Sequence, residues 1–96
     1  MVIERAELPI MAGREREFEQ VFARARRHLE EAQGCRHVSL ARGVETPSKY
    51  LLLIHWQTLE AHQAFTSTPG FETFKALAGP FFSGRPNTEH YVPLAE

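Results

Sequence analysis

A nearly unbroken apolar run at residues 50–54, YLLLI, is the feature that most limits the folds open to this 96-residue chain. The run is far too short to cross a membrane, and its composition is typical of a strand that is covered on both faces. Trp56 follows it, and Thr58 then stands where an N-cap is expected before a helically spaced segment. We therefore expect a buried strand that leads directly into a helix.

Two patterned segments precede this strand. Residues 2–8 alternate between two faces, and Pro9 ends the strand that the alternation predicts. Residues 14–33 carry apolar side chains at helical spacing, and Gly34 follows where a left-handed C-cap is expected. The apolar positions of this long helix are Phe18, Val21, Phe22, Ala25, Leu29 and Ala32.

A hairpin is expected between the long helix and the apolar run. Residues 35–42 alternate again and predict a strand, on which Cys35 and His37 share one face. Residues 43–48 contain Gly, Pro and Ser, and the connection is short enough to make the two strands antiparallel neighbours.

The last third of the chain is expected to form a broken helix and a final strand. The first helical piece ends near Ser67, because Thr68 and Pro69 have the pattern of a new N-cap and first helical residue. Residues 87–94 alternate enough to be a strand, and Pro93 predicts that it lies at a sheet edge because proline has no N–H to donate.

The order strand, helix, strand, strand, broken helix, strand predicts one α+β domain over residues 1–96. It is the ferredoxin-like β-α-β-β-α-β sandwich, with one antiparallel sheet and both helices on one face. Apolar side chains on both faces of the central strand predict that the open sheet face meets a second copy of the chain. The side chains expected toward the partner are Leu51, Leu53 and His55, and those expected toward the helices are Leu52, Ile54 and Trp56.

Composition excludes several classes of protein. The formal net charge is -1 with mixed signs along the chain, which argues against nucleic-acid binding and against a polybasic membrane patch. The only cysteine is Cys35 and residues 1–8 lack the apolar core of a signal peptide, so we expect a reducing, cytoplasmic location. The five histidines show no metal-ligand spacing, and we assign no metal site.

Several residues together suggest a family. They are Gly34-Cys35 after the long helix, Trp56 at the end of the apolar strand, Glu60-Ala61, and the spaced aromatics Phe71 and Phe74. With this pattern, nearly the whole chain resembles the antibiotic biosynthesis monooxygenase domain of the dimeric α+β barrel superfamily. The resemblance implies a homodimeric barrel and oxidation of phenolic or quinol substrates without a metal or flavin cofactor. Oxygenating members tend to carry an asparagine where this chain has Leu52, and many carry a histidine where it has Phe65.

The candidate site lies around the strand–helix junction. His62 is the candidate proton-transfer residue, because an imidazole with a pKa near 6.5 can accept a phenolic proton at neutral pH. Trp56 is the candidate wall or hydrogen-bond donor for a flat ligand, although a large aromatic residue at a strand–helix junction is more often buried for core packing. The candidate substrate-binding residues are Phe22, Leu52, Phe65, Phe74 and Phe81.

Two functions remain open on the sequence. The first is a cofactor-independent monooxygenase or small oxidoreductase that acts on an aromatic or quinol-type molecule. The second is a non-catalytic dimeric module that binds a small hydrophobic ligand, which the apolar Leu52 and Phe65 favour. Haem binding, known from other relatives, is less favoured because the first strand has no asparagine.

Overall fold

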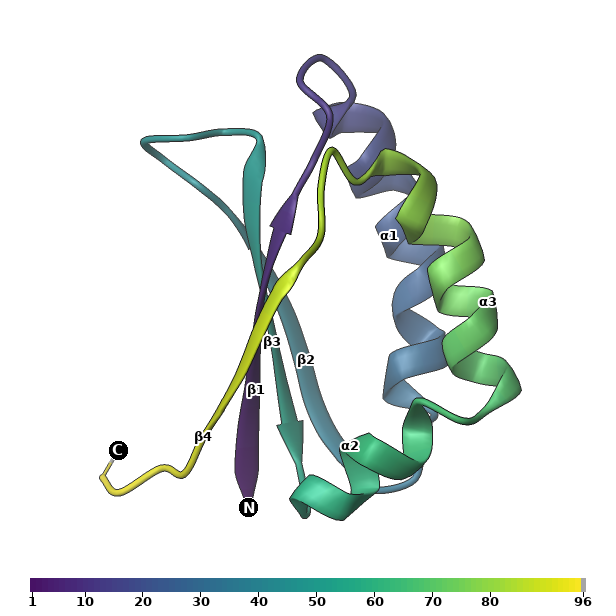
Figure 1. Ribbon diagram of the computed structural model, residues 1–96, viewed down its shortest axis with the longest axis vertical. Helices are drawn as coiled ribbons and strands as arrows, with labels where there is room; N and C mark the ends of the chain where they lie inside the picture. Colours follow the sequence, from purple (N-terminus) through teal and green to yellow (C-terminus); the bar gives the residue numbers. More distant parts are fainter. Residues whose placement is uncertain (96) are drawn as a thin grey trace.

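Four antiparallel strands form the sheet of the computed structural model, which describes residues 1–95. The strand order is β2-β3-β1-β4, and α1 and α3 lie on the same side of the sheet (Figure 1). The predicted α+β ferredoxin-like fold is thereby confirmed. The elements are β1 (Val2–Pro9), α1 (Glu15–Glu30), β2 (Cys35–Arg42), β3 (Lys49–Trp56), α2 (Leu59–Phe65), α3 (Pro69–Ala78), the 3-10 turn η1 (Gly79–Phe81) and β4 (Asn87–Tyr91).

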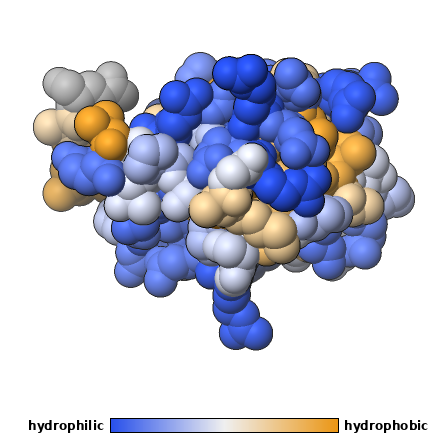
Figure 2. Space-filling view, turned by 90° about the horizontal axis from the view of Figure 1, so that it is seen from above, coloured by the Kyte–Doolittle hydropathy of each residue, from blue (hydrophilic) through white to orange (hydrophobic). Residues whose placement is uncertain are grey.

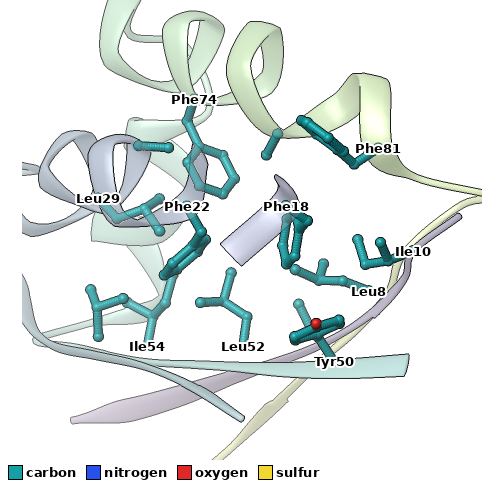
Figure 3. Packing of buried hydrophobic residues seen from close by; sticks show 14 of the residues in the cluster. Leu8, Ile10, Phe18, Phe22, Leu29, Tyr50, Leu52, Ile54, Phe74 and Phe81 are labelled. Carbon is teal, nitrogen blue, oxygen red and sulfur yellow. The ribbon is translucent and has the colours of Figure 1, made fainter. Parts of the chain in front are cut away.

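The apolar run is the inner strand β3, which pairs with β2 on one side and β1 on the other. Alternate residues from Tyr50 to Trp56 are buried toward the helices, whereas Leu51 and Leu53 lie half-buried on the open face. The core joins this strand to the helices (Figure 3). Phe18 packs edge-on against Tyr50, with ring centroids 5.0 Å apart.

The helices follow the predicted pattern with one difference in length. The buried residues of α1 are Phe18, Phe22, Ala25 and Leu29. The helix ends at Glu30, three residues before the predicted end, because the Ala32 N–H bonds to the Leu29 carbonyl and tightens the last turn. The break between α2 and α3 falls where expected: Thr58 and Thr68 each accept a hydrogen bond from a backbone N–H of the helix that follows.

A β-bulge changes the start of β2. Cys35 pairs with Trp56 while His37 pairs with His55, so the register shifts between the two residues of β2. The prediction that Cys35 and His37 share a face is therefore wrong, because the extra residue at Arg36 reverses the alternation. Cys35 packs against the core, and His37 lies beside His55 on the open face with ring centroids 5.6 Å apart.

The final strand lies at the sheet edge, as Pro93 predicts, and is shorter than expected. It ends at Tyr91 rather than at residue 94. The pairing with β1 explains the length of β4. Tyr91 pairs with Ile3, and β1 begins only one residue earlier, so almost none of β1 is left to pair with residues beyond Tyr91.

The surface seen from above is mostly hydrophilic, with hydrophobic residues in small patches (Figure 2). Among residues 1–95, every helix is too short or too polar to cross a bilayer.

Gly34 offers a test of how the turn after α1 packs against α2. Its φ of +86° is in the left-handed region, and an added Cβ would lie 2.7 Å from the Ala61 side chain of α2. We expect Gly34→Ala to lower the free energy of unfolding by about 3 kcal/mol, from backbone strain plus overpacking. Urea denaturation measures the loss.

Gly13→Ala is the matched control. Gly13 has a similar φ of +90° and nothing within 4 Å of the new Cβ, so it carries the backbone strain alone. Equal losses in the two variants would contradict a contact between the Gly34 turn and α2.

Candidate functional site

A cavity of about 810 Å³ lies between the helix-facing side of the sheet and the α2–α3 roof. Its floor includes Glu4, Ala6 and Leu8 of β1 and Leu52 of β3. Its roof includes His62 of α2 and Phe71 and Phe74 of α3. The lining is mainly apolar with a few polar groups, which is typical of a pocket for a small molecule.

Glu4 is the buried charged residue of this floor. It lies on the otherwise apolar face of β1, is 7% exposed, and accepts a 2.9 Å hydrogen bond from the Trp56 ring N–H through Oε1. A buried carboxylate is costly unless it is hydrogen-bonded or paired. The bond from Trp56 therefore fixes the carboxylate beside the cavity and offsets part of that cost.

His62 lines the cavity beside Glu4. Its ring stacks on Trp56, with centroids 5.2 Å apart and an interplanar angle of 14°. Its Nε2 is 3.3 Å from Glu4 Oε1, and its Nδ1 is 2.7 Å from His90 Nε2. Burial lowers the pKa of His62, the Glu4 carboxylate opposes this, and His90 adds to the lowering. The ring is thus favoured in its neutral form at pH 7.

His90 reaches the site from the far end of the sequence. It is the cross-strand partner of Glu4 in the β1–β4 ladder, so both side chains point to the helix-facing side. Unlike Glu4 and His62, His90 is exposed. Trp56, Glu4, His62 and His90 therefore form a connected polar chain from the core to the surface.

Charged residues of α3 also line the cavity. Lys75 Nζ lies 4.9 Å from the centre of the Phe71 ring and 3.2 Å from a Glu72 carboxylate oxygen. Both charged side chains are more than half exposed. Because they pair with each other and stay solvated, they define an edge of the site and not its buried centre.

The structure brings together three of the residues expected at the site: His62, Leu52 and Phe74 line the cavity. Trp56 is fully buried and lies behind His62, so it supports the wall and donates its N–H to Glu4 instead of facing a ligand. The wall position expected for it is wrong, because the α2 imidazole covers the indole.

The other three aromatic residues do not line this cavity, although Phe22 and Phe65 pack behind its lining residues Phe74 and Phe71. Phe22 borders a different hollow between α1 and the β2–β3 hairpin, and Phe65 borders another beside the end of α1. Phe81 packs near Phe18, with ring centroids 6.1 Å apart. Their helical spacing marked them as buried, but it did not say which part of the core each would join.

Sequence reasoning missed Glu4 and His90 as site residues. Glu4 had a detectable signal, since it is the one acidic residue on the strand face that also carries Val2, Ala6 and Leu8. The sequence signal for His90 was weaker, because it consists only of the position of His90 on one face of the short alternating segment 87–94. Together with His62 they can accept, hold and donate protons beside an apolar cavity.

Comparisons with known proteins agree with this architecture. The sequence pattern of the family described as "Antibiotic biosynthesis monooxygenase" matches residues 1–77. The uncharacterized protein YczJ of Bacillus subtilis (strain 168) is 38% identical over 92 residues, which are 95% of this chain and 97% of that protein.

Solved structures show the same fold. A Bordetella bronchiseptica protein named for the same family has a TM-score of 0.94 and 32% identity, over 98% of this chain and 97% of that chain. SnoaB from Streptomyces nogalater, a cofactor-independent oxygenase solved as a single-residue mutant, has a TM-score of 0.83 and 18% identity, over 99% of this chain and 94% of that one. On the match over residues 1–77 and these full-length relatives, the chain belongs to the antibiotic biosynthesis monooxygenase family.

Proposed function

We propose that the protein is a cofactor-independent monooxygenase, or related small oxidoreductase, that acts on an aromatic or quinol-type small molecule in the cavity beneath α2 and α3. The observation that carries the proposal is the Glu4–His62 pair, which lines the wall of an otherwise largely apolar cavity. The family membership and the fold shared with the cofactor-independent oxygenase SnoaB support the reaction class.

The step that the protein has to catalyse is the removal of a proton from the substrate. An acidic phenol or anthrone becomes electron-rich enough to react with dioxygen once it loses a proton, so a general base is the main catalytic group required. Glu4 Oε1 is occupied by Trp56 and His62, which leaves Oε2 as the acceptor for the substrate proton. Oxidation of an anthrone methylene to a carbonyl then balances: dioxygen supplies the carbonyl oxygen and is otherwise reduced to one water.

The apolar lining holds such a substrate in place. Phe71, Phe74 and Leu52 offer flat or aliphatic contacts to a ring system, and about 810 Å³ is within the size range of small-molecule pockets. Exclusion of water by these side chains strengthens the electrostatic interaction between a substrate anion and the groups around it.

We further propose that two copies associate through the open sheet face, in a reducing cytoplasm that suits the unpaired Cys35. Leu51 and Leu53 stand half-buried on this face. Beside them Arg5 bridges Glu7 and Glu89, at 3.0 and 2.6 Å. An apolar centre flanked by fixed charges is the usual anatomy of a protein interface.

A binding module without catalysis is the second candidate. Leu52 forms part of the cavity floor, at a position where oxygenating members of the family tend to carry an asparagine. An apolar surface of this kind binds a hydrophobic ligand without reacting with it. Saturable binding of anthrone or a quinol without oxygen uptake would support this candidate over the oxygenase.

Glu4→Gln is the central test of the oxygenase. The amide keeps the shape and still accepts the Trp56 N–H, but it cannot take a proton. We expect oxygen consumption with anthrone-type and quinol substrates to fall by roughly 10²- to 10⁴-fold with little change in melting temperature.

Glu72→Gln is the control, since it changes another carboxylate of the same cavity that pairs with Lys75 in solvent. We expect it to keep nearly full activity. Equal rates in wild type and Glu4→Gln would remove Glu4 as the base.

The pH dependence tests His62. Because burial lowers the pKa of His62, the ring gains a proton only on the acidic side of its usual range near 6.5. We expect an acidic limb in the pH profile of kcat/KM where His62 gains its proton beside Glu4. His62→Gln should move this limb, and a profile that stays in place would show that His62 takes no part.

The dimer has its own test. Leu53→Arg places a charge at the centre of the open face, and we expect it to weaken association at least about tenfold, as loss of an interface anchor does. Val44→Arg is the control, because Val44 is 87% exposed in the β2–β3 turn. Analytical ultracentrifugation distinguishes them; a wild-type monomer at micromolar concentration would refute the interface.

A further inference from the structure

His90 connects the buried proton-transfer pair with the surface. Glu4 is 7% exposed and the His62 side chain 15% exposed, whereas His90 is exposed on the edge strand β4. The 2.7 Å contact between His62 Nδ1 and His90 Nε2 joins the two environments. We propose that His90 is the proton relay of the site and that protons pass between solvent and the Glu4–His62 pair through it, an inference that rests on the proposed function.

The two contacts of the His62 ring indicate where the protons lie. His62 Nε2 faces Glu4 Oε1, so a carboxylate at Glu4 favours the His62 tautomer that carries its proton on Nε2. Nδ1 of His62 is then an acceptor, and the proton between the two rings belongs to His90 Nε2. His90 is left with an unprotonated Nδ1.

One proton can then enter without breaking the contact between the rings. Water or hydronium gives a proton to His90 Nδ1, and the proton on His90 Nε2 crosses to His62 Nδ1. His62 becomes the imidazolium beside Glu4, and His90 stays neutral with its proton on Nδ1. In the first step an O–H bond of hydronium or water breaks as the His90 Nδ1–H bond forms, and in the second the His90 Nε2–H bond breaks as the His62 Nδ1–H bond forms. The reverse sequence releases a proton to solvent.

The other titratable groups around the cavity are poorly placed for this task. Glu72 and Lys75 of α3 line it but pair with each other at 3.2 Å. A ligand in the cavity would also displace the water that reaches His62 from that side. His90 contacts Nδ1 of His62, the ring nitrogen that faces away from Glu4. Protons can therefore still pass between His62 and solvent through His90 when a ligand fills the cavity.

The His90→Gln variant distinguishes a role of His90 in proton transfer from a role in holding the His62 ring. The glutamine amide can still donate an N–H to His62 Nδ1, but it cannot pass a proton on. We expect proton exchange between His62 Nδ1 and solvent, followed by ¹⁵N NMR of that nitrogen in the free protein, to slow by roughly tenfold or more. The matched control is His28→Gln, on α1 and outside this cluster, which should leave the exchange rate unchanged.

His90→Ala provides the complementary experiment. Because position 90 is exposed, imidazole from the buffer can reach His62 Nδ1 in this variant. We expect the exchange rate to rise with imidazole concentration in His90→Ala and to stay constant in His90→Gln, where the amide occupies the position. A thermal melt confirms that both variants are folded.

The outcomes separate this inference from the proposed function. Wild-type exchange in His90→Gln, or no effect of imidazole on His90→Ala, would overturn the relay whatever the activity of the protein. Absence of oxygen consumption by the wild type would overturn the proposed function, while slowed exchange in His90→Gln would still support the relay. With an active wild type, a lowered kcat in His90→Gln that imidazole restores in His90→Ala supports both.

Discussion

The hydrogen bond from Trp56 to Glu4 is the interaction on which the site depends. It joins the end of β3 to a residue near the start of the neighbouring strand β1, and it allows a carboxylate to stay beside an apolar core. The same indole supports the His62 ring by stacking. One fully buried side chain thus sets the position of both groups that face the cavity, which explains why the tryptophan matters although it lies behind the wall.

The fold was predictable because its signals are local. The alternation in β1, the helical spacing in α1 and the caps Thr58 and Thr68 each act within a few residues, and the structure confirms all of them. The bulge at the start of β2 was not predictable in this way. It depends on how Cys35 and His37 pair with β3, and periodicity in one strand carries no information about its partner.

The site was only partly predictable for a related reason. Periodicity tells which face a residue occupies, and it correctly placed Leu52 on the helix-facing side of its strand and Phe74 on the buried side of its helix. It does not tell which residues from distant segments meet there. Glu4 and His90 come from the two ends of the chain, and only the β1–β4 register makes them neighbours of His62. The acidic residue on the apolar face of β1 was the available clue.

The broken roof has a consequence for how such a protein diversifies. Because α2 and α3 have separate caps, each helix can tolerate changes that leave the start of the other intact. The short helix α2 carries the titrating ring, whereas α3 carries the aromatic surface that a ligand would touch. Substitutions on α3 can therefore reshape the cavity while Glu4 and His62 keep their arrangement, so that the polar pair and the aromatic lining are free to evolve on different segments.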